Sequence, residues 1–419
     1  MKQQIVLLFI LFIVFQAPQH TVSAQYTRSL SKNIRTVQTV VNGDPLQPPV
    51  ARLGSRVEVG FDQLSHAYTR YIYKIEFCNA DWTPATEIFE SDYLQGFNGR
   101  PLEDYETSFN TTVLYTHYRL VLPNEDVRLL LPGNYRVSFY VDEEDNEHPV
   151  AEACFSLLSP QMSVGATVTT NTDIDFNQTH QQLSFNVSYG TRRVVDPQRE
   201  LRTVVMQNRR RDCAVVNLPP NIQKATGVEW NHRRELIFPA GAEFHKFEML
   251  DMHVSGMGID RMQWFEPFYH ATLFAVTPQR NYTYDQDADG AFIVRTMDDE
   301  DVDIQADYAY VHFFLQTPRL PGGDVYVCGL WDGGFPDPEC RMTYDEQAGT
   351  YEAVVPLKQG YYSYQFRQLD SEGVGQTART EGDFYQTENE YIILVYHRPQ
   401  GARYDALVGY ANIKSDGNH

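Results

Sequence analysis

The sequence predicts an all-β protein built from serial immunoglobulin- or fibronectin-like β-sandwich domains. Its 419 residues include 27 Tyr and 24 Phe, and both residue types are favoured in strands. Short segments alternate between apolar and polar residues, which is the period of a strand with one buried face. Segments with the helical period are scarce, and Gly, Pro and Asn separate the alternating segments, as is typical of sandwiches.

The alternating segments follow one another along most of the chain. In residues 56–61, Val57, Val59 and Phe61 fall on one side of the predicted strand. The segment 134–141 follows the turn-forming sequence LPGN, in which Pro fixes φ and Gly tolerates a positive φ. Residues 198–210 are the best helix candidate. Further strands are predicted at 182–189, 324–328 and 362–366, and the apolar run 391–395 predicts a central strand.

The chain length and the ends of the strand groups predict several domains. A signal peptide is predicted at 1–24, because Lys2 precedes an apolar run and Val22-Ser23-Ala24 forms a cleavage site. We then expect an N-terminal β-sandwich at 25–158, a middle β domain at 159–297, a C-terminal β-sandwich at 298–413 and a flexible tail at 414–419. The acidic segment 298–303 indicates a solvated linker or edge.

The N-terminal segment and the charge predict the compartment and exclude some partners. The apolar run 5–15 is too short to span a bilayer, so a signal peptide is favoured over a signal anchor. Cleavage would leave Gln25 first in an exported, soluble protein without membrane insertion. The chain has 55 acidic and 34 basic residues, a net charge of -21, which argues against nucleic acid and anionic headgroups as partners.

Five cysteines are too few for a disulfide scaffold, but an exported protein can oxidise individual pairs. Cys328 and Cys340 flank one loop and are the best candidates for a disulfide. Cys78 and Cys154 lie in separate strand-like segments and could meet across a sheet, which would leave Cys213 over. Five buried thiols are an equally good interpretation.

Motifs for catalysis, cofactors and metals are absent from the sequence. There is no G-x-S-x-G, H-E-x-x-H, Walker or G-x-G-x-x-G motif, so no catalytic residue and no cofactor is expected. His245 and His253 would share a strand face but lack ligand spacing. Residues 285–290, DQDADG, match half of an EF-hand loop, but Thr296 stands where a Glu is needed. A tight acidic turn is therefore favoured, and a calcium site stays open as the alternative.

Three ordered signatures together resemble a known family. They are EFCNADWT at 76–83 with DYLQGF at 92–97, YTHYRLVLPN at 115–124 with LPGNY at 131–135, and EGDFYQTENEY at 381–391 with VYHR at 395–398 and RYDALVGY at 403–410. In this combination the chain resembles the plug protein family of the type IX secretion system, formerly a domain of unknown function. Within the chain, the segment that begins with residues 325–331 and runs to residue 366 is also similar to immunoglobulin-like E-set modules that bind glycogen.

The resemblance implies a non-catalytic periplasmic protein on the inner side of the outer membrane. Its implied partner is the large outer-membrane β-barrel translocon, whose periplasmic opening it would occlude when idle. Each signature also has a structural explanation. Asp81 would close a turn that packs Trp82 under a loop, and Asn389 would cap the turn before the strand at 391–395.

Two other functions are weighed against this one. A carbohydrate-binding protein would use Trp331, Tyr362 and Tyr364 as a stacking platform. However, Tyr362, Tyr364 and Phe366 share one face of an alternating strand, which is typical of a core. A hydrolase is the third and weakest hypothesis, and it would need a cleft with two carboxylates about 5 to 9 Å apart.

Overall fold

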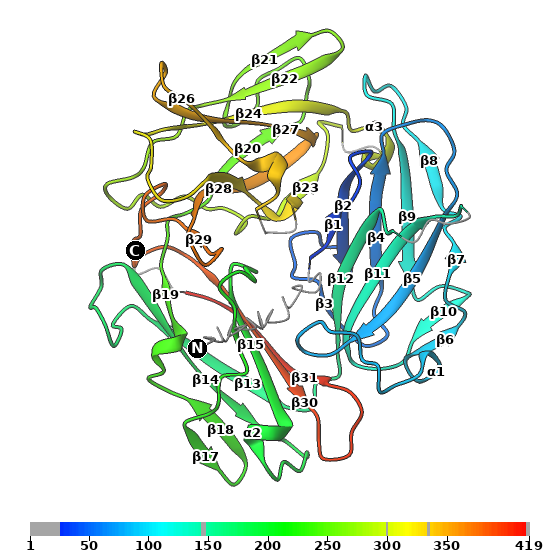
Figure 1. Cartoon of the computed structure of the whole chain (residues 1–419), viewed down its shortest axis with the longest axis vertical. Coiled ribbons are helices and arrows are strands. Elements are labelled where there is room, and N and C mark those ends of the chain that lie inside the picture. The colour runs from blue at the N-terminus through cyan, green and yellow to red at the C-terminus, as the bar shows by residue number, and fades with distance from the viewer. Residues whose placement is uncertain (1–25, 144–147, 299–300, 333–335, 416–419) are drawn as a thin grey trace, which may run out of the picture.

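In the computed structural model, the described residues, 26–143, 148–298, 301–332 and 336–415, form three β-sandwiches (Figure 1). The prediction of an all-β fold built from sandwiches is confirmed, since strands dominate and the helices are single turns. The first sandwich stands on the right of Figure 1, the second at the lower left and the third at the upper left. The predicted signal peptide lies outside the described residues.

The first sandwich packs two sheets around one core. In β4 the buried side chains Val57, Val59 and Phe61 alternate with more exposed ones, as the sequence predicts. One sheet has the order β1-β12-β11-β5-β7 with β3 beside β12, and the other has the order β2-β4-β9-β8. The strands are β1 (Arg28–Ser29), β2 (Ile34–Val41), β3 (Val50–Arg52), β4 (Val57–Gln63), β5 (Tyr71–Cys78), β7 (Arg100–Pro101), β8 (Tyr105–Thr107), β9 (Thr116–Leu122), β11 (Gly133–Val141) and β12 (Ala151–Leu158), with α1 (Glu90–Tyr93) and the ribbon β6 (Leu94–Gly96)–β10 (Val127–Leu129) at one end.

The second sandwich is built from two separate parts of the chain. One sheet has the order β13-β14-β18-β17 with β19 beside β14, and the other has the order β16-β15-β30-β31. The elements are β13 (Ser163–Thr169), β14 (His180–Ser188), α2 (Pro197–Glu200), β15 (Leu201–Gln207), β16 (Val215–Val216), β17 (Ile222–Lys224), β18 (Gly227–Trp230), η1 (Arg234–Leu236), β19 (Ile237–Pro239), β30 (Glu390–His397) and β31 (Ala406–Lys414).

The third sandwich lies between these two parts in sequence. One sheet forms around β28, which pairs with β20, β23, β25 and β29, and the other has the order β21-β22-β24-β27-β26. The elements are β20 (His245–Met249), β21 (Ile259–Phe265), β22 (Phe268–Leu273), β23 (Phe292–Val294), α3 (Val302–Gln305), β24 (Tyr308–Gln316), β25 (Val325–Cys328), η2 (Leu330–Asp332), η3 (Pro338–Cys340), β26 (Thr343–Asp345), β27 (Thr350–Lys358), β28 (Gly360–Leu369) and β29 (Gly375–Gln376).

The predicted boundaries 159–297 and 298–413 do not match this pairing. Strands β20 to β23 pair within the third sandwich, while β30 and β31 return to pair with β15 in the second. Alternation identifies a strand but not its partner, which is why the boundary at 297 is wrong. The predicted tail at 414–419 also begins inside the fold, since Lys414 ends β31 and Ser415 is buried; 416–419 lie outside the described residues.

The helix candidate at 198–210 is mostly the strand β15. Val205 faces the core of the second sandwich, whereas Val204 and Met206 face the first sandwich. Both faces of β15 are therefore apolar, and the alternation that would have marked it as a strand is missing.

Candidate functional site

The three sandwiches meet at one junction, and the first pairwise contact joins the first and second sandwiches. An apolar cluster places Ala80 of the first sandwich against Met206 and Leu394 of the second. Beside it, the fully buried Asp405 carboxylate accepts hydrogen bonds from the Ala80 backbone at 3.0 Å and from Arg202 at 2.7 Å. Apolar burial, combined with a buried carboxylate of which one oxygen accepts both hydrogen bonds, indicates a fixed contact.

A buried ion pair joins the first and third sandwiches. Lys358 at the end of β27 donates to Asp62 in β4 at 2.7 Å, and both side chains are 1% exposed. The same carboxylate accepts from the Tyr308 hydroxyl at 2.6 Å and contacts the His117 ring at 2.7 Å. Burial disfavours the ionised form of Asp62, but Lys358 and His117 outweigh that effect and lower its pKa below the ordinary value.

A polar contact joins the second and third sandwiches. The Arg210 guanidinium pairs with Asp212 and donates to the Gly375 carbonyl, and the Gly375 amide donates to Asp212 at 3.0 Å. Nearby, Lys414 of β31 pairs with Asp289 at 3.1 Å. Side chains and backbone groups of both sandwiches are thus mutually satisfied across this interface.

Two carboxyl groups at this last contact have strongly raised pKa values. Burial, together with the nearby Asp289, raises the pKa of Asp287 to about 8. Burial also raises the pKa of Glu243 to about 7, although the Tyr282 hydroxyl bonds to it at 2.7 Å. The second and third sandwiches therefore share a contact whose charge changes near neutral pH.

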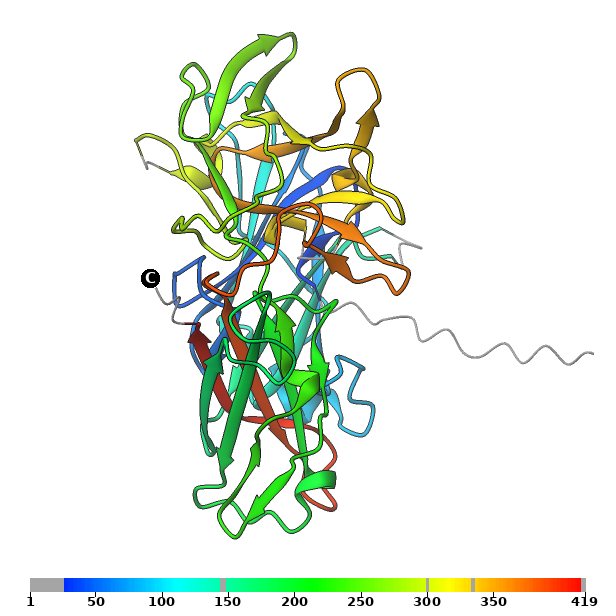
Figure 2. The ribbon, with the colours of Figure 1, turned by 90° about the vertical axis from the view of Figure 1, so that its left-hand side faces the viewer.

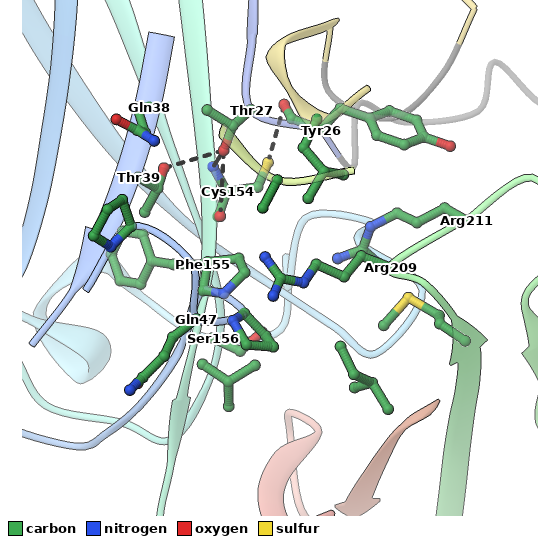
Figure 3. Close-up of a pocket in the computed structure, with 18 of the residues that line it drawn as sticks. Tyr26, Thr27, Gln38, Thr39, Gln47, Cys154, Phe155, Ser156, Arg209 and Arg211 are labelled. Carbon is green, nitrogen blue, oxygen red and sulfur yellow. Dashed lines mark hydrogen bonds between the residues drawn. The ribbon is translucent and has the colours of Figure 1, made fainter. Parts of the chain in front are cut away.

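A cavity of about 120 Å³ lies where all three sandwiches converge (Figure 3). Phe155 comes from the first sandwich, Met206 and Ile392 from the second, and Phe292 and Leu330 from the third. Two guanidinium groups, those of Arg209 and Arg211, reach into this apolar space (Figure 3).

The two arginines of the cavity contact residues of the first and the second sandwich. Arg209 pairs with Glu390 at 2.8 Å and donates to the Leu46 carbonyl. Arg211 stacks on the Trp82 ring with 4.9 Å between the guanidinium carbon and the ring centroid. Both arginines project from the second sandwich onto the first, so they strengthen the junction as well as line the cavity.

Comparison with known proteins identifies the family. Residues 34–159, which cover most of the first sandwich, match the family described as "Type 9 secretion system plug protein 1st domain". The chain belongs to the type 9 secretion plug protein family. A crystal structure of a hypothetical protein from Parabacteroides merdae ATCC 43184 is 39% identical, covers 93% of this chain and 99% of its own, and has a TM-score of 0.90.

The other comparisons add nothing to this assignment. The C-terminal domain of the Streptococcus pyogenes antigen I/II-family protein AspA is 7% identical over 91% of this chain and 99% of its own, with a TM-score of 0.16. No curated protein matches.

Membership of this family indicates the general role and the compartment of this plug protein. It consists of non-enzymatic components of protein secretion, and membership implies a periplasmic location. In the described part of the chain, every helix is too short to cross a bilayer.

Cys328 and Cys340, the predicted disulfide partners, are both buried in the third sandwich, and the disulfide between them stays a prediction. Val325 and Val327 face the core of the third sandwich, and Cys340 joins that core. Strand alternation places Cys328 on the opposite side of β25.

Cys78 and Cys154 lie on the same face of one sheet and contact Trp82. Strand β11 lies between β5 and β12, because Asn134 pairs with Cys78 and Arg136 with Cys154. Two strand spacings amount to about 10 Å, which is beyond the reach of a disulfide. The suggestion that this pair could meet across a sheet is therefore wrong.

The three residues of the hypothetical sugar platform do come together, with Tyr362 and Tyr364 in the core and the half-buried Trp331 packed against it. Tyr362 is 1% exposed and Tyr364 is 4% exposed, and Trp331 packs edge-on against Tyr362 with ring centroids 5.7 Å apart. A buried ring cannot stack on a sugar. The alternation of 362–366 correctly indicated core, and no exposed platform exists at these positions.

The acidic sequence at 285–290 forms a turn at the junction. The Asp289 amide donates to the Asp287 carboxylate at 2.7 Å, and Asp285 pairs with Lys246. Asp287 and Asp285 thus each have a partner within the fold. In the ranges that the structure describes, no group of three or more His, Cys, Asp and Glu side chains is arranged to hold a metal.

The two histidines singled out in the sequence do not share a strand face. His253 lies beyond the end of β20, whereas His245 begins it and bonds to the buried Glu381 at 2.8 Å. Burial alone would lower the pKa of His245, but the Glu381 carboxylate raises it above the ordinary value.

Sequence reasoning missed the residues that hold the junction together. Asp62 and Lys358 are 296 positions apart, and each lies in an otherwise ordinary strand sequence. The expected turn at Asp81 is confirmed, since the Thr83 amide donates to the Asp81 carboxylate at 3.1 Å beside the buried Trp82. The expected cap at Asn389 is wrong, because the Asn389 side chain bonds instead to Asn208, Gln181 and the Ala240 carbonyl, which are distant in sequence.

Proposed function

We propose that this plug protein is a non-catalytic stopper that occludes the periplasmic opening of the outer-membrane translocon of type 9 secretion when that translocon is idle. The family assignment supports the general role. The observation that carries the specific one is the junction, because buried contacts join each sandwich to both others. A stopper must resist deformation, and a packed junction lets three small domains act as one block.

The dimensions agree with this role. A compact chain of about 390 residues has a radius of gyration near 21 Å, which corresponds to a sphere about 55 Å across. A barrel of about 36 strands, the largest class, is about 70 Å wide between backbones, given the strand spacing and tilt. Side chains on the barrel wall narrow that opening further. One rigid block of three sandwiches can fill most of such an opening, whereas a single sandwich cannot.

The charge distribution suits reversible contact. Many arginines already pair with carboxylates on the surface, such as Arg100 with Asp126 and Arg319 with Glu346. Exposed pairs of this kind are weak and exchange partners easily. A polar, wet rim of this type lets a stopper leave when cargo arrives.

The test is electrical and uses the whole mature chain. Purified translocon is placed in a planar bilayer, and its conductance is recorded before and after the chain is added on the periplasmic side. We expect the conductance to fall, and a matched addition on the opposite side to leave it unchanged. Unaltered conductance, together with failure to recover the translocon in a pull-down from solubilised outer membranes, would refute the proposal.

A further inference from the structure

The cavity where the three sandwiches converge has a mainly apolar wall. Phe155 of the first sandwich, Met206 and Ile392 of the second and Phe292 of the third line it, and each is at most 4% exposed. Cavities lined by such deeply buried apolar side chains hold no water but accept apolar molecules. A molecule bound in this space would contact all three sandwiches at once.

Several polar side chains on the wall already have partners within the fold. The Thr27 and Thr39 hydroxyls share a hydrogen bond of 3.1 Å, and the Gln38 amide donates to the Phe292 carbonyl at 3.2 Å. The Ser156 hydroxyl donates to an asparagine of the first sandwich at 2.7 Å. These groups therefore do not require a ligand.

Arg211 differs from these polar groups, because its hydrogen-bond donors are unused. Its guanidinium carbon lies over the Trp82 ring, 4.9 Å from the centroid, so this contact uses the face of the guanidinium. The five N–H donors lie in the plane of the group and point away from that contact. The chain has 55 acidic residues, yet among the residues that the structure describes no carboxylate or other acceptor bonds to this guanidinium.

Arg209 adds a second positive charge to the cavity. Its Nε donates to Glu390 at 2.8 Å and its Nη2 donates to the Leu46 carbonyl, while Nη1 has no hydrogen bond within the described ranges. Figure 3 shows the guanidinium groups of Arg209 and Arg211 turned into the same space. Glu390 balances one of the two charges, and the other is left without a counter-charge in an apolar surrounding, which favours an anion there.

Shape and charge together select the class of ligand. A neutral apolar molecule would leave the donors of Arg211 unsatisfied, and inorganic phosphate would leave the apolar wall uncovered. A carboxylate matches a guanidinium through two parallel hydrogen bonds. The cavity volume of about 120 Å³ is close to that of cavities of about 150 Å³ that bind benzene, so the apolar body of the ligand is about the size of one ring. A long acyl chain is too large.

We propose that this cavity binds a small amphipathic carboxylate, an aromatic or short branched acid. Its carboxylate meets Arg211, and its apolar body lies against Phe155, Met206 and Ile392. The inference goes beyond the stopper role. Because the ligand contacts all three sandwiches and binds only the folded chain, it stabilises the junction, and the rigidity of the block then depends on the ligand concentration.

The test adds three probes to the full mature chain at neutral pH: sodium benzoate, the neutral benzyl alcohol and inorganic phosphate. Binding is measured by isothermal titration calorimetry, and the melting temperature by thermal unfolding. At a hundredfold excess over its Kd, benzoate should raise the melting temperature by about 3 °C in a chain of this length. Benzyl alcohol, which lacks the charge, and phosphate, which lacks the apolar body, should raise it far less.

Two variants locate the site. Arg211→Met keeps the length of the side chain and removes the guanidinium, whereas the control Arg319→Met removes a 70% exposed guanidinium of the third sandwich. We expect Arg211→Met to weaken benzoate binding at least about tenfold, the effect of losing a charged hydrogen bond, and the control to change it less than about twofold. If Arg211→Met fails to fold, Arg211→Lys keeps the charge without the planar fork and should still weaken binding several-fold.

Several outcomes would overturn the inference. These are equal effects of benzoate and benzyl alcohol, equal effects of benzoate and phosphate, absence of benzoate binding, and unchanged benzoate affinity in the folded Arg211 variant. A peptide ending in phenylalanine that binds at least about tenfold more tightly than benzoate would assign the cavity to a chain terminus and also overturn it. The stopper role would stand in each case, because its conductance test uses no added ligand.

Discussion

Replacing Lys358 with methionine tests whether the buried ion pair holds the first and third sandwiches together. At the observed 2.7 Å and an effective dielectric constant near 20, the attraction between the two charges is about 6 kcal/mol before desolvation is subtracted. Removing one partner of a buried pair costs about 3 to 5 kcal/mol. We expect the lower end, about 3 kcal/mol, because Asp62 keeps its contacts with Tyr308 and His117.

The measurement combines urea unfolding with hydrogen exchange of β4 and β27, the two strands that the pair connects. We expect Lys358→Met to unfold at lower urea and to lose protection in both strands. The control is Lys224→Met, which removes the charge of a 58% exposed lysine paired with Glu229 and should cost under about 1 kcal/mol. Adding Asp62→Asn to Lys358→Met should recover part of the loss. If Lys358→Met is no more destabilising than Lys224→Met, the pair does not hold the junction.

Three further predictions concern the junction and the cores. The pKa of Asp287, raised to about 8, means that the folded state favours the protonated carboxyl, so the free energy of unfolding falls as pH rises from about 4 to 8. Asp287→Asn should remove part of that fall, by about 1.4 kcal/mol for each unit of pKa shift, in urea titrations at several pH values. Gly133→Ala should cost about 1 to 3 kcal/mol in thermal unfolding, since φ is 153° and the added carbon would lie 2.4 Å from the Phe77 ring. A reducing agent should leave the melting temperature unchanged, because the buried Cys328 and Cys340 side chains pack as small apolar groups.

Controls and contrary outcomes are available for these three predictions. Asp285→Asn changes a 54% exposed carboxylate of the same turn and should keep the pH dependence of the wild type. A flat pH profile of the wild type would contradict the reasoning about Asp287. Gly54→Ala has a positive φ of 89° but nothing within 4 Å, so it should cost less than Gly133→Ala. A clear drop in melting temperature on reduction would indicate a disulfide.

The sequence predicts the strands well where one face is buried and the other is wet. The segments containing Val57, Tyr135 and Tyr362 all form strands with the expected side chains inside. It fails at β15, where both faces are covered and the period disappears. The turn at Asp81 follows from local side-chain chemistry, which acts over two residues and can be read directly.

The partners of strands and the contacts between sandwiches could not be predicted. Nothing in the sequence around Lys358 indicates that its ammonium meets Asp62 in another domain. Pairing between distant segments depends on shape and on total burial, which no local pattern records. The signatures between residues 76 and 135 nevertheless identified the family correctly, and they lie within the matched residues 34–159.

The return of β30 and β31 to the second sandwich has a consequence for how the chain is made. Strand β15 is synthesised nearly 190 residues before β30. The edge of β15 that pairs with β30 therefore has no partner until the C-terminal strands have been made. Asp405, which anchors the first sandwich, comes with the same strands. A chain that ends before β30 therefore cannot complete the second sandwich, and it lacks the contact of Asp405 with the first sandwich. It also leaves one edge of β15 unpaired and accessible to proteases. Because of this topology, only a chain synthesised through β31 can complete the second sandwich and join it to the first.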